Sequence, residues 1–209
     1  MKKIVVALAA AVAVAGAVFV PRAEACGPIV RRETDPRAMG LAKAERALEQ
    51  GQFAAAALNV TQAFPAIRSA QPGTDPLTSR ALRVMALAVV RADGAITLGT
   101  DWRGATGAQR AQNLEWSANA LRAIVTARPA DPSAQGDLGE ELAKIPKSHA
   151  EALGILNGLA QKDLLGSAHA YAALARLRAA AGDKPGRDAA VAKCQAMTQT
   201  QSICAVPNS

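Results

Sequence analysis

Three expected helix starts in this chain share the same dipeptide, an aspartate followed directly by a proline. They occur at Asp35-Pro36, Asp75-Pro76 and Asp131-Pro132. Aspartate is a preferred N-cap residue, because its side chain accepts hydrogen bonds from backbone N–H groups of the first helical turn. Proline is favoured at the first helical position, where its missing N–H removes no helical hydrogen bond. The repeated pair predicts that much of the chain is α-helical.

The composition supports a helical fold and argues against other classes. Half of the 209 residues are hydrophobic, which is too many for a disordered chain, and only 3% are aromatic. The scarcity of aromatic and β-branched residues beyond the N-terminus disfavours an all-β sandwich or barrel. Good helix formers, above all alanine, dominate the sequence after residue 35. We therefore expect an all-α fold with no β-sheet.

The spacing of apolar residues, glycines and prolines predicts eight helices, beginning near residues 36, 53, 76, 106, 132, 148, 167 and 185. The second is expected to run to Ala70 with a kink at Pro65, and the sixth to open with a capping box from Ser148 to Glu151. One longer loop is expected from about Ala95 to Gly104. The other links are short, and short links make successive helices antiparallel. The pattern therefore predicts about four antiparallel helical hairpins over residues 35–199.

The first 25 residues have the layout of a signal peptide. Lys2 and Lys3 precede an uninterrupted apolar run over residues 4–20, and Ala23-Glu24-Ala25 offers a small-x-small cleavage pattern. We expect cleavage after Ala25, which would leave residues 26–34 as a short lead-in to the helices. The alternative is an uncleaved anchor helix, because the apolar run reaches the lower limit for spanning a bilayer.

This segment predicts a periplasmic or otherwise exported protein. Its removal would lower the net charge from +7 to +5, because three basic residues and one acidic residue are lost. That moderate excess gives no indication of nucleic-acid binding. Lipidation of Cys26 is a second possibility and would make the chain an outer-membrane lipoprotein, although Ala23 and Glu24 do not fit a lipoprotein signal well.

The three cysteines suggest one disulfide and one odd thiol in an oxidising compartment. We expect Cys194 to pair with Cys204, which requires the last helix to end near residue 199 and the tail, residues 200–209, to fold back. Cys26 is then free, lipidated or paired between chains. A bond from Cys26 to either of the other two cysteines remains the alternative.

An internal repeat links the last two predicted hairpins. At an offset of 36 residues, Leu138-Gly139 falls over Leu174-Ala175. The first hairpin adds the small residues Ala44 and Ala47 and a Gly-polar-aromatic turn, Gly51-Gln52-Phe53. The last hairpin has a comparable turn at Gly182-Asp183, and Tyr171 stands three residues before its Leu-small pair. These positions resemble the tetratricopeptide repeat, a helix-turn-helix unit of about 34 residues. The resemblance implies an α-solenoid whose concave face binds proteins or peptides.

No catalytic or metal-binding motif accompanies these patterns. The chain lacks a Gly-x-Ser-x-Gly elbow, a His-Glu-x-x-His helix, a glycine-rich phosphate loop and a Cys-x-x-Cys pair. The adjacent carboxylates Glu140 and Glu141 are expected to be solvated charges on the outside of their helix. His149 and His169, each in the first turn of a helix, are expected to have surface roles. We therefore expect no enzyme activity, no metal and no cofactor.

Trp102 and Arg103, in the expected long loop, are candidate partner contacts, because loop tryptophans beside charges often contact partners. The alternative is that the indole of Trp102 covers one end of the core. Arginines spread over the middle and late helices would suit an acidic ligand only if several shared one surface: Arg80, Arg83, Arg91, Arg103, Arg110, Arg122, Arg128, Arg176 and Arg178. The sequence thus favours a noncatalytic exported scaffold for an unidentified protein or peptide partner. A small-molecule or glycan binding module, with a cleft between hairpins or under the Trp102 loop, is the alternative.

Overall fold

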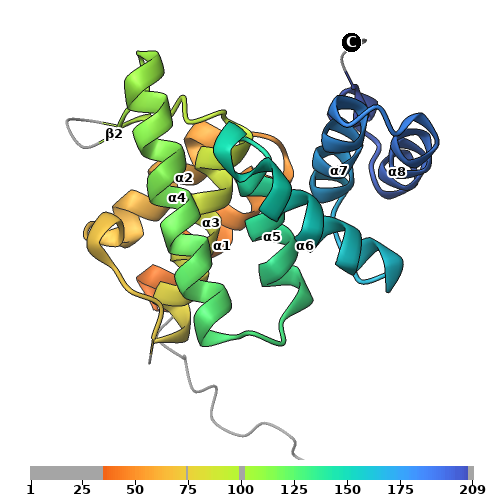
Figure 1. Cartoon of the computed structure of the whole chain (residues 1–209). Helices are drawn as coiled ribbons and strands as arrows, with labels where there is room; N and C mark the ends of the chain where they lie inside the picture. Colours follow the sequence, from red (N-terminus) through yellow and green to blue (C-terminus); the bar gives the residue numbers. More distant parts are fainter. Residues whose placement is uncertain (1–34, 74, 99–101, 207–209) are drawn as a thin grey trace, which may run out of the picture. The chain divides into compact units, whose positions relative to one another are not determined.

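The computed structural model describes residues 35–73, 75–98 and 102–206, which lie within the second of the chain's two compact units, Thr34–Ser209. This part is mostly helical (Figure 1), so the all-α prediction is confirmed. Its α-helices are α1 (Pro36–Glu49), α2 (Phe53–Ala63), α3 (Pro76–Arg91), α4 (Gly107–Ala127), α5 (Pro132–Leu142), α6 (His149–Gln161), α7 (Ala168–Ala180) and α8 (Lys184–Met197). Short 3₁₀ helices are η1 (Ile67–Ser69), η2 (Pro146–Ser148) and η3 (Gln201–Cys204).

The three Asp-Pro pairs start helices as predicted. The Asp35 carboxylate accepts a hydrogen bond from the backbone N–H of Arg37 at 2.8 Å, and Asp75 accepts one from Leu77 at 3.0 Å. Asp131 accepts two, from Ser133 and from Ala134. In each case the proline occupies the first helical turn, so each pair sets the beginning of α1, α3 or α5.

Two helix-end predictions were wrong. The second helix does not continue through Pro65 with a kink: α2 ends at Ala63, and the chain passes into η1. Proline has no N–H for a helical hydrogen bond and clashes with the preceding turn, and here that ends the helix. Ser148 makes no side-chain capping hydrogen bond to α6. A reciprocal capping box instead starts α4, between Thr106 and Gln109.

The prediction of no β-sheet also needs correction. The strands β1 (Thr97–Leu98) and β2 (Trp102–Arg103) pair antiparallel, with Thr97 opposite Arg103 and Leu98 opposite Trp102. A further backbone hydrogen bond runs from the N–H of Gly104 to the carbonyl of Ile96 at 2.9 Å. Antiparallel strands need only a short connection, so the loop between α3 and α4 closes on itself as a two-stranded ribbon.

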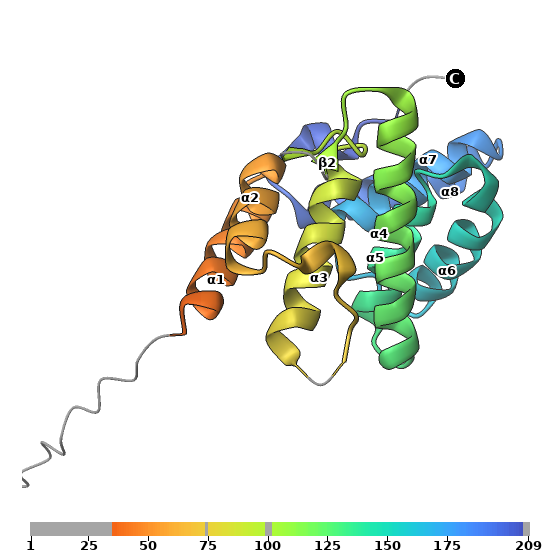
Figure 2. The ribbon, with the colours of Figure 1, turned by 90° about the vertical axis from the view of Figure 1, so that its left-hand side faces the viewer.

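The helices of this unit contact one another in a regular order. Each helix packs against the next along the chain, and α3 also contacts α1 and α5, while α5 contacts α7. Figures 1 and 2 show α3 among its neighbours and α7 and α8 following at the blue end of the chain. Nine residues of α3 are buried, so this helix is the centre of the core. The odd-numbered helices thus form a row of neighbours with the even-numbered helices between them in sequence.

Gly139 lies where α5 packs against Leu156 and Ile155 of α6. A Cβ atom at this position would lie 2.7 Å from both Cγ and Cδ2 of Leu156. We predict that Gly139→Leu lowers the free energy of unfolding by about 3 kcal/mol, because the packed crossing has no room for a larger side chain. Gly107→Leu is the matched control, since a Cβ at Gly107 meets no atom within 4 Å. Equal thermal unfolding midpoints for the two variants would contradict this prediction.

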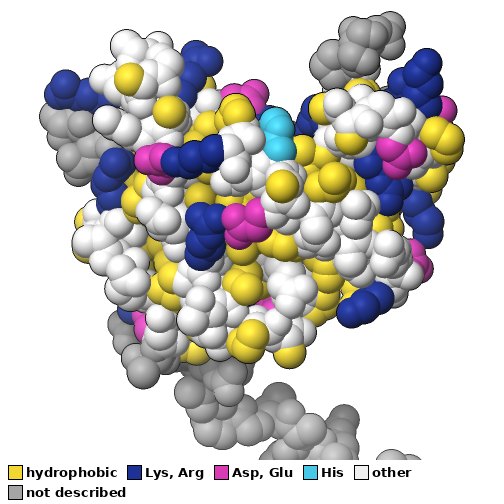
Figure 3. All heavy atoms as spheres, in the orientation of Figure 1, with side chains coloured by type: hydrophobic (Ala, Val, Ile, Leu, Met, Phe, Trp, Pro, Cys, Tyr) yellow, Lys and Arg dark blue, Asp and Glu magenta, His cyan; other side chains and the backbone are white. Residues whose placement is uncertain are grey.

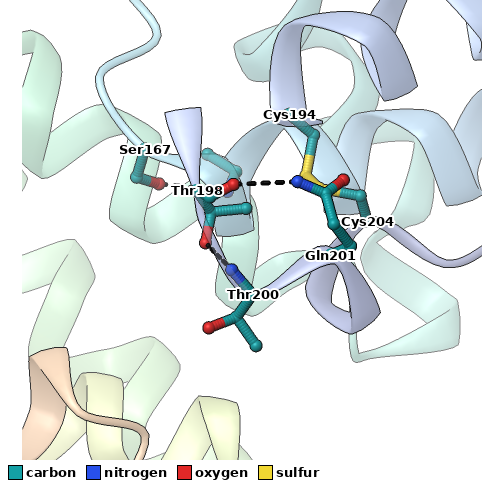
Figure 4. The surroundings of a disulfide bond; sticks show 7 residues. Ser167, Cys194, Thr198, Thr200, Gln201 and Cys204 are labelled. Carbon is teal, nitrogen blue, oxygen red and sulfur yellow. Dashed lines mark hydrogen bonds between the residues drawn. A yellow bond between two sulfur atoms is a disulfide. The ribbon is translucent and has the colours of Figure 1, made fainter. Parts of the chain in front are cut away.

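The predicted disulfide is confirmed between Cys194 on α8 and Cys204 in η3, with their Cα atoms 5.8 Å apart. Because α8 ends at Met197, the following residues can turn back toward it (Figure 4). Two hydrogen bonds shape this turn: the backbone N–H of Thr200 donates to Oγ1 of Thr198, and Nε2 of Gln201 donates to the carbonyl of Thr198. Both cysteines are buried, and the returning segment packs on α7.

We predict that Cys204→Ser lowers stability only under oxidising conditions. Loss of a cross-link that closes a short loop costs about 2–3 kcal/mol, chiefly because the unfolded chain gains conformational freedom. Thermal unfolding with and without a thiol reductant measures this difference. If the variant lost as much relative to the native protein in reducing buffer, the disulfide would not be the source of the stability.

Some predictions fall on residues outside the described ranges. The signal peptide (residues 1–25), the lead-in (residues 26–34) and Cys26 all lie there. Among the helices that the structure describes, none combines the length and the apolar character needed to cross a membrane.

Candidate functional site

A groove of about 440 Å³ opens along the row of odd-numbered helices. Residues of α1, α3 and α5 line it, together with the residue that caps α7. We call this feature the odd-helix groove; its lining residues are Glu45, Leu48, Glu49, Arg80, Arg83, Val84, Leu87, Arg91, Asp137 and Ser167. Its apolar members Leu48, Val84 and Leu87 are buried, so mainly charged side chains are accessible in it.

Ion pairs join α1 to α3 on one side of the groove. The guanidinium of Arg80 donates to both carboxylate oxygens of Glu45, at 2.8 and 2.9 Å. Farther toward the N-terminal ends of both helices, Arg37 pairs with Asp75, and the hydroxyl of Thr78 also donates to that carboxylate. The hydrogen bonds from Thr78 and Arg37 lower the pKa of Asp75 to about 2. These exposed contacts link α1 to α3 at two points along the helices.

A second set of ion pairs joins α3 to α5 and is more deeply buried. Arg91 donates to Glu140 through Nε at 3.0 Å and Nη2 at 3.1 Å, which is a bidentate pair. The two side chains are 11% and 3% exposed. Burial opposes ionisation of Glu140, but the charge and hydrogen bonds of Arg91, with smaller effects of His169 and Lys144, together outweigh it, so the pKa of Glu140 is lowered. Glu140 is therefore a buried carboxylate whose ionised form depends mainly on Arg91.

The neighbouring pair, Arg83 with Asp137, reaches the groove itself. The Arg83 side chain is 39% exposed, whereas that of Asp137 is 6% exposed. Burial raises the pKa of Asp137, and Arg83 acts against this effect. The pair thus presents a partly exposed guanidinium above a buried carboxylate. A ligand in the groove would meet the cation first.

Further charges gather where α3, α5 and α7 meet. Lys144 pairs with Asp93 just beyond the end of α3. Burial lowers the pKa of His169 on α7 to about 4. The nearby cations Arg91, Arg176 and Lys144 lower this pKa further, whereas the negative charge of Glu140 raises it. The imidazole is therefore neutral near pH 7 and lies edge-on to the ring of Phe53, with the centroids 6.5 Å apart. The expected surface role of His169 needs correction, because this side chain is half-buried, whereas His149 is exposed.

Glu141 lies in a polar cluster inside the core. Its side chain is fully buried, and neither carboxylate oxygen has a hydrogen-bond partner in the structure. Ser117 lies beside it, but the Ser117 hydroxyl donates to the carbonyl of Leu114 at 3.0 Å. Burial raises the pKa of Glu141 to about 8; the charge of Glu140 adds to this rise, and Ser117 and Lys144 oppose it. Glu141 is therefore protonated at neutral pH.

The expectation that Glu140 and Glu141 are solvated was wrong, since both are buried. The sequence did hold a signal for Glu141. It follows Ala134 by seven residues and Leu138 by three, which places it on the same stripe of α5 as those buried residues. The burial of Glu140 and Asp137 depends on arginines of α3, about 50 residues earlier, and local spacing does not reveal such pairs.

Trp102 is part of the core, not of the exposed surface. Its indole is 3% exposed and packs edge-on against Trp116 with centroids 4.8 Å apart. The guanidinium of Arg68 lies over the Trp102 ring, 4.6 Å from its centroid. A partner cannot reach this indole without moving these groups, so the idea of Trp102 as a partner contact is corrected in favour of the alternative, in which the indole covers the core. Arg103 is exposed and remains a candidate contact.

The arginines do not form one basic surface. Arg80, Arg83 and Arg91 of α3 line the odd-helix groove. Four others engage separate partners: Arg110 the carbonyl of Gly104, Arg122 Glu151, Arg128 Asp131, and Arg178 both Asn157 and the carbonyl of Gly186. Most arginines of the middle helices therefore form local contacts. The odd-helix groove itself carries both positive and negative side chains.

Within the described residues, no group of three or more histidine, cysteine or acidic side chains is arranged to hold a metal ion. No family model matches the chain, and neither a curated protein nor a solved structure matches it.

Proposed function

We propose that this protein is a noncatalytic, exported helical-repeat scaffold of the bacterial cell envelope, built as a tetratricopeptide-like stack of four hairpins, and that its odd-helix groove binds a segment of a partner protein. The observation that carries the proposal is the shared groove of α1, α3 and α5. It is open, and its accessible side chains are mainly charged.

The register of the ion pairs supports a repeat-like stack. Along α3, Arg80 contacts Glu45 of α1, whereas Arg83 and Arg91 contact Asp137 and Glu140 of α5, in the same order in both helices. Helices that pair in the same order run in the same direction. Parallel alternate helices are what successive antiparallel hairpins produce when they stack.

The chemistry of the groove suits a peptide segment better than a small molecule. Small-molecule sites are usually concave, mostly apolar cavities that enclose the ligand. This groove is open and carries charges of both signs, including the exposed Glu49 and the guanidinium of Arg80, whose side chain is 57% exposed. A partner segment with both acidic and basic side chains would complement it.

Charge changes in the groove test this proposal. Glu49→Lys combined with Arg80→Glu inverts two exposed charges without altering the buried pairs of α3 and α5. We expect this variant to lose at least about tenfold in affinity for proteins that co-purify with the native chain, because like charges would then oppose each other at the contact. Arg122→Glu on α4 is the control, since Arg122 is comparably exposed and lies outside the groove.

Quantitative mass spectrometry of captured envelope proteins provides the measurement. The proposal requires at least one protein that the native chain and the Arg122 control retain and the groove variant loses. Retention of the same proteins at the same yield by all three would overturn it.

A further inference from the structure

A second groove, of about 750 Å³, lies between the C-terminal part of α4, the start of α5 and one face of α6. We call it the α6 groove. Its lining is mostly apolar or glycine, including Val125, Leu138, Gly154, Ile155, Gly158 and Leu164. The Leu164 side chain is 46% exposed at the edge, which is unusual for a large apolar residue. Figure 3 shows hydrophobic atoms exposed among a few charged side chains on the face of the molecule that it views.

The centre of the exposed face of α6 carries glycines, which have no side chain. Gly154 and Gly158 are one turn apart, and a Cβ at either position would meet no atom within 4 Å. The space above them is therefore open, and another helix could approach the backbone of α6 closely there. In the part of the chain that the structure describes, no atom packs close to the Cβ position of either glycine, in contrast to Gly139 on α5.

Charges of opposite sign lie at the two ends of this face. Glu151, Gly154, Gly158 and Lys162 follow each other at intervals of three or four residues, so they lie on one side of the helix. The backbone N–H of Lys162 donates to the carbonyl of Leu159, but its side-chain ammonium forms no hydrogen bond or ion pair with any other residue in the described ranges. Glu151 engages Arg122 through Oε2 at 2.7 Å, and its Oε1 accepts no hydrogen bond within the same ranges.

We infer that the α6 groove binds the α6 of a second copy of this chain, in an antiparallel, two-fold symmetric dimer. An antiparallel pairing centred near Leu156 brings Gly154 of one copy close to Gly158 of the other. Glu151 lies five residues before this centre and Lys162 six residues after it, so each Glu151 faces the Lys162 of the other copy. Because a two-fold interface uses the same surface twice, one such face supplies both ion pairs. This inference goes beyond the proposed function and does not depend on it.

The oligomeric state of the full chain tests the dimer directly. The measurements use sedimentation velocity over a wide range of protein concentration, in a Cys26→Ser background so that an interchain disulfide cannot produce a dimer. We expect the parent protein to show a reversible monomer–dimer equilibrium. Gly158→Leu should leave only folded monomer, because the new side chain fills the space of closest approach, whereas its Cβ meets no described atom within 4 Å. Gly107→Leu is the matched control and should dimerise like the parent.

A charge exchange tests the antiparallel arrangement. Glu151→Lys should weaken the dimer by about tenfold or more, since two attractive contacts become repulsive at once. Adding Lys162→Glu should restore it. In the double variant the cation introduced at position 151 still lies beside Arg122, so restoration reports the contact with position 162 of the other copy. A monomer at every concentration, a dimer that tolerates Gly158→Leu, or a failure of the second charge change to restore dimerisation would each overturn the inference.

Discussion

Replacing Arg91 by alanine is expected to lower the free energy of unfolding by about 3–5 kcal/mol. Arg91 is the bidentate partner of Glu140, and both side chains are almost fully buried. Without the guanidinium, the Glu140 carboxylate would be left in the core without its compensating charge. The cost arises from this uncompensated group more than from the attraction that is lost. Urea unfolding at neutral pH, followed by circular dichroism, measures the effect.

Two further variants identify the cause. Arg80→Ala removes another bidentate arginine of α3, but Arg80 is exposed, so we expect a loss of about 0–1 kcal/mol. The double variant Arg91→Met/Glu140→Met removes both buried charges and should recover most of the stability that Arg91→Ala loses. If Arg91→Ala and Arg80→Ala were equally stable, the buried pair would not be important for folding.

Replacing Glu141 by glutamine is expected to raise the free energy of unfolding at pH 7 by about 3 kcal/mol. In the unfolded chain this carboxyl is ionised at neutral pH, whereas in the folded protein burial keeps it protonated, with a pKa of about 8. Folding at pH 7 must therefore bind a proton at Glu141, and the glutamine variant avoids that cost. The amide is close in shape to the protonated carboxyl, so the packing around Ser117 should be preserved.

The stability difference between Glu141→Gln and the native chain should depend on pH. The pKa of Glu141 is raised on folding from 4.5 to about 8, so its stabilising contribution is complete below pH 4.5. It is then lost as pH rises through 8, at a rate of up to about 1.4 kcal/mol per pH unit. The stability difference between Glu141→Gln and the native chain should grow across this window and then level off. Glu115→Gln, at an exposed position on α4, should show no such growth, and a constant difference for Glu141→Gln would contradict the account.

Local signals predicted most of the helices, but not the polar interior. The Asp-Pro pairs place the starts of α1, α3 and α5 because capping depends on neighbours within one turn. The disulfide between Cys194 and Cys204 was predictable because a helix end near residue 199 brings the two cysteines within reach. The end of α2 at Ala63 shows that Pro65 terminated the helix where a kink was expected.

The charged site could not be predicted in the same way. Glu140 and Glu141 are adjacent acids, which usually indicates solvent exposure, although the spacing of Glu141 from Ala134 and Leu138 matches the buried stripe of α5. Whether they are buried is decided by α3, α4 and α7, which pack around α5. The charge of Arg91 then compensates the charge of the Glu140 carboxylate, whereas Glu141 has no such partner among the described residues and is protonated. The odd-helix groove likewise exists only after α1, α3 and α5 have come together.

Site-specific photo-crosslinking tests the odd-helix groove most directly as a partner-binding surface. A benzoylphenylalanine residue replaces Glu49 in the groove or, as the control, Asn119 on α4; both positions are exposed, so neither replacement disturbs the core. After irradiation of intact cells, the account predicts a discrete crosslinked product with a partner protein from position 49 and none of that mass from position 119. Crosslinking to the same proteins from both positions, or from position 119 alone, would contradict it.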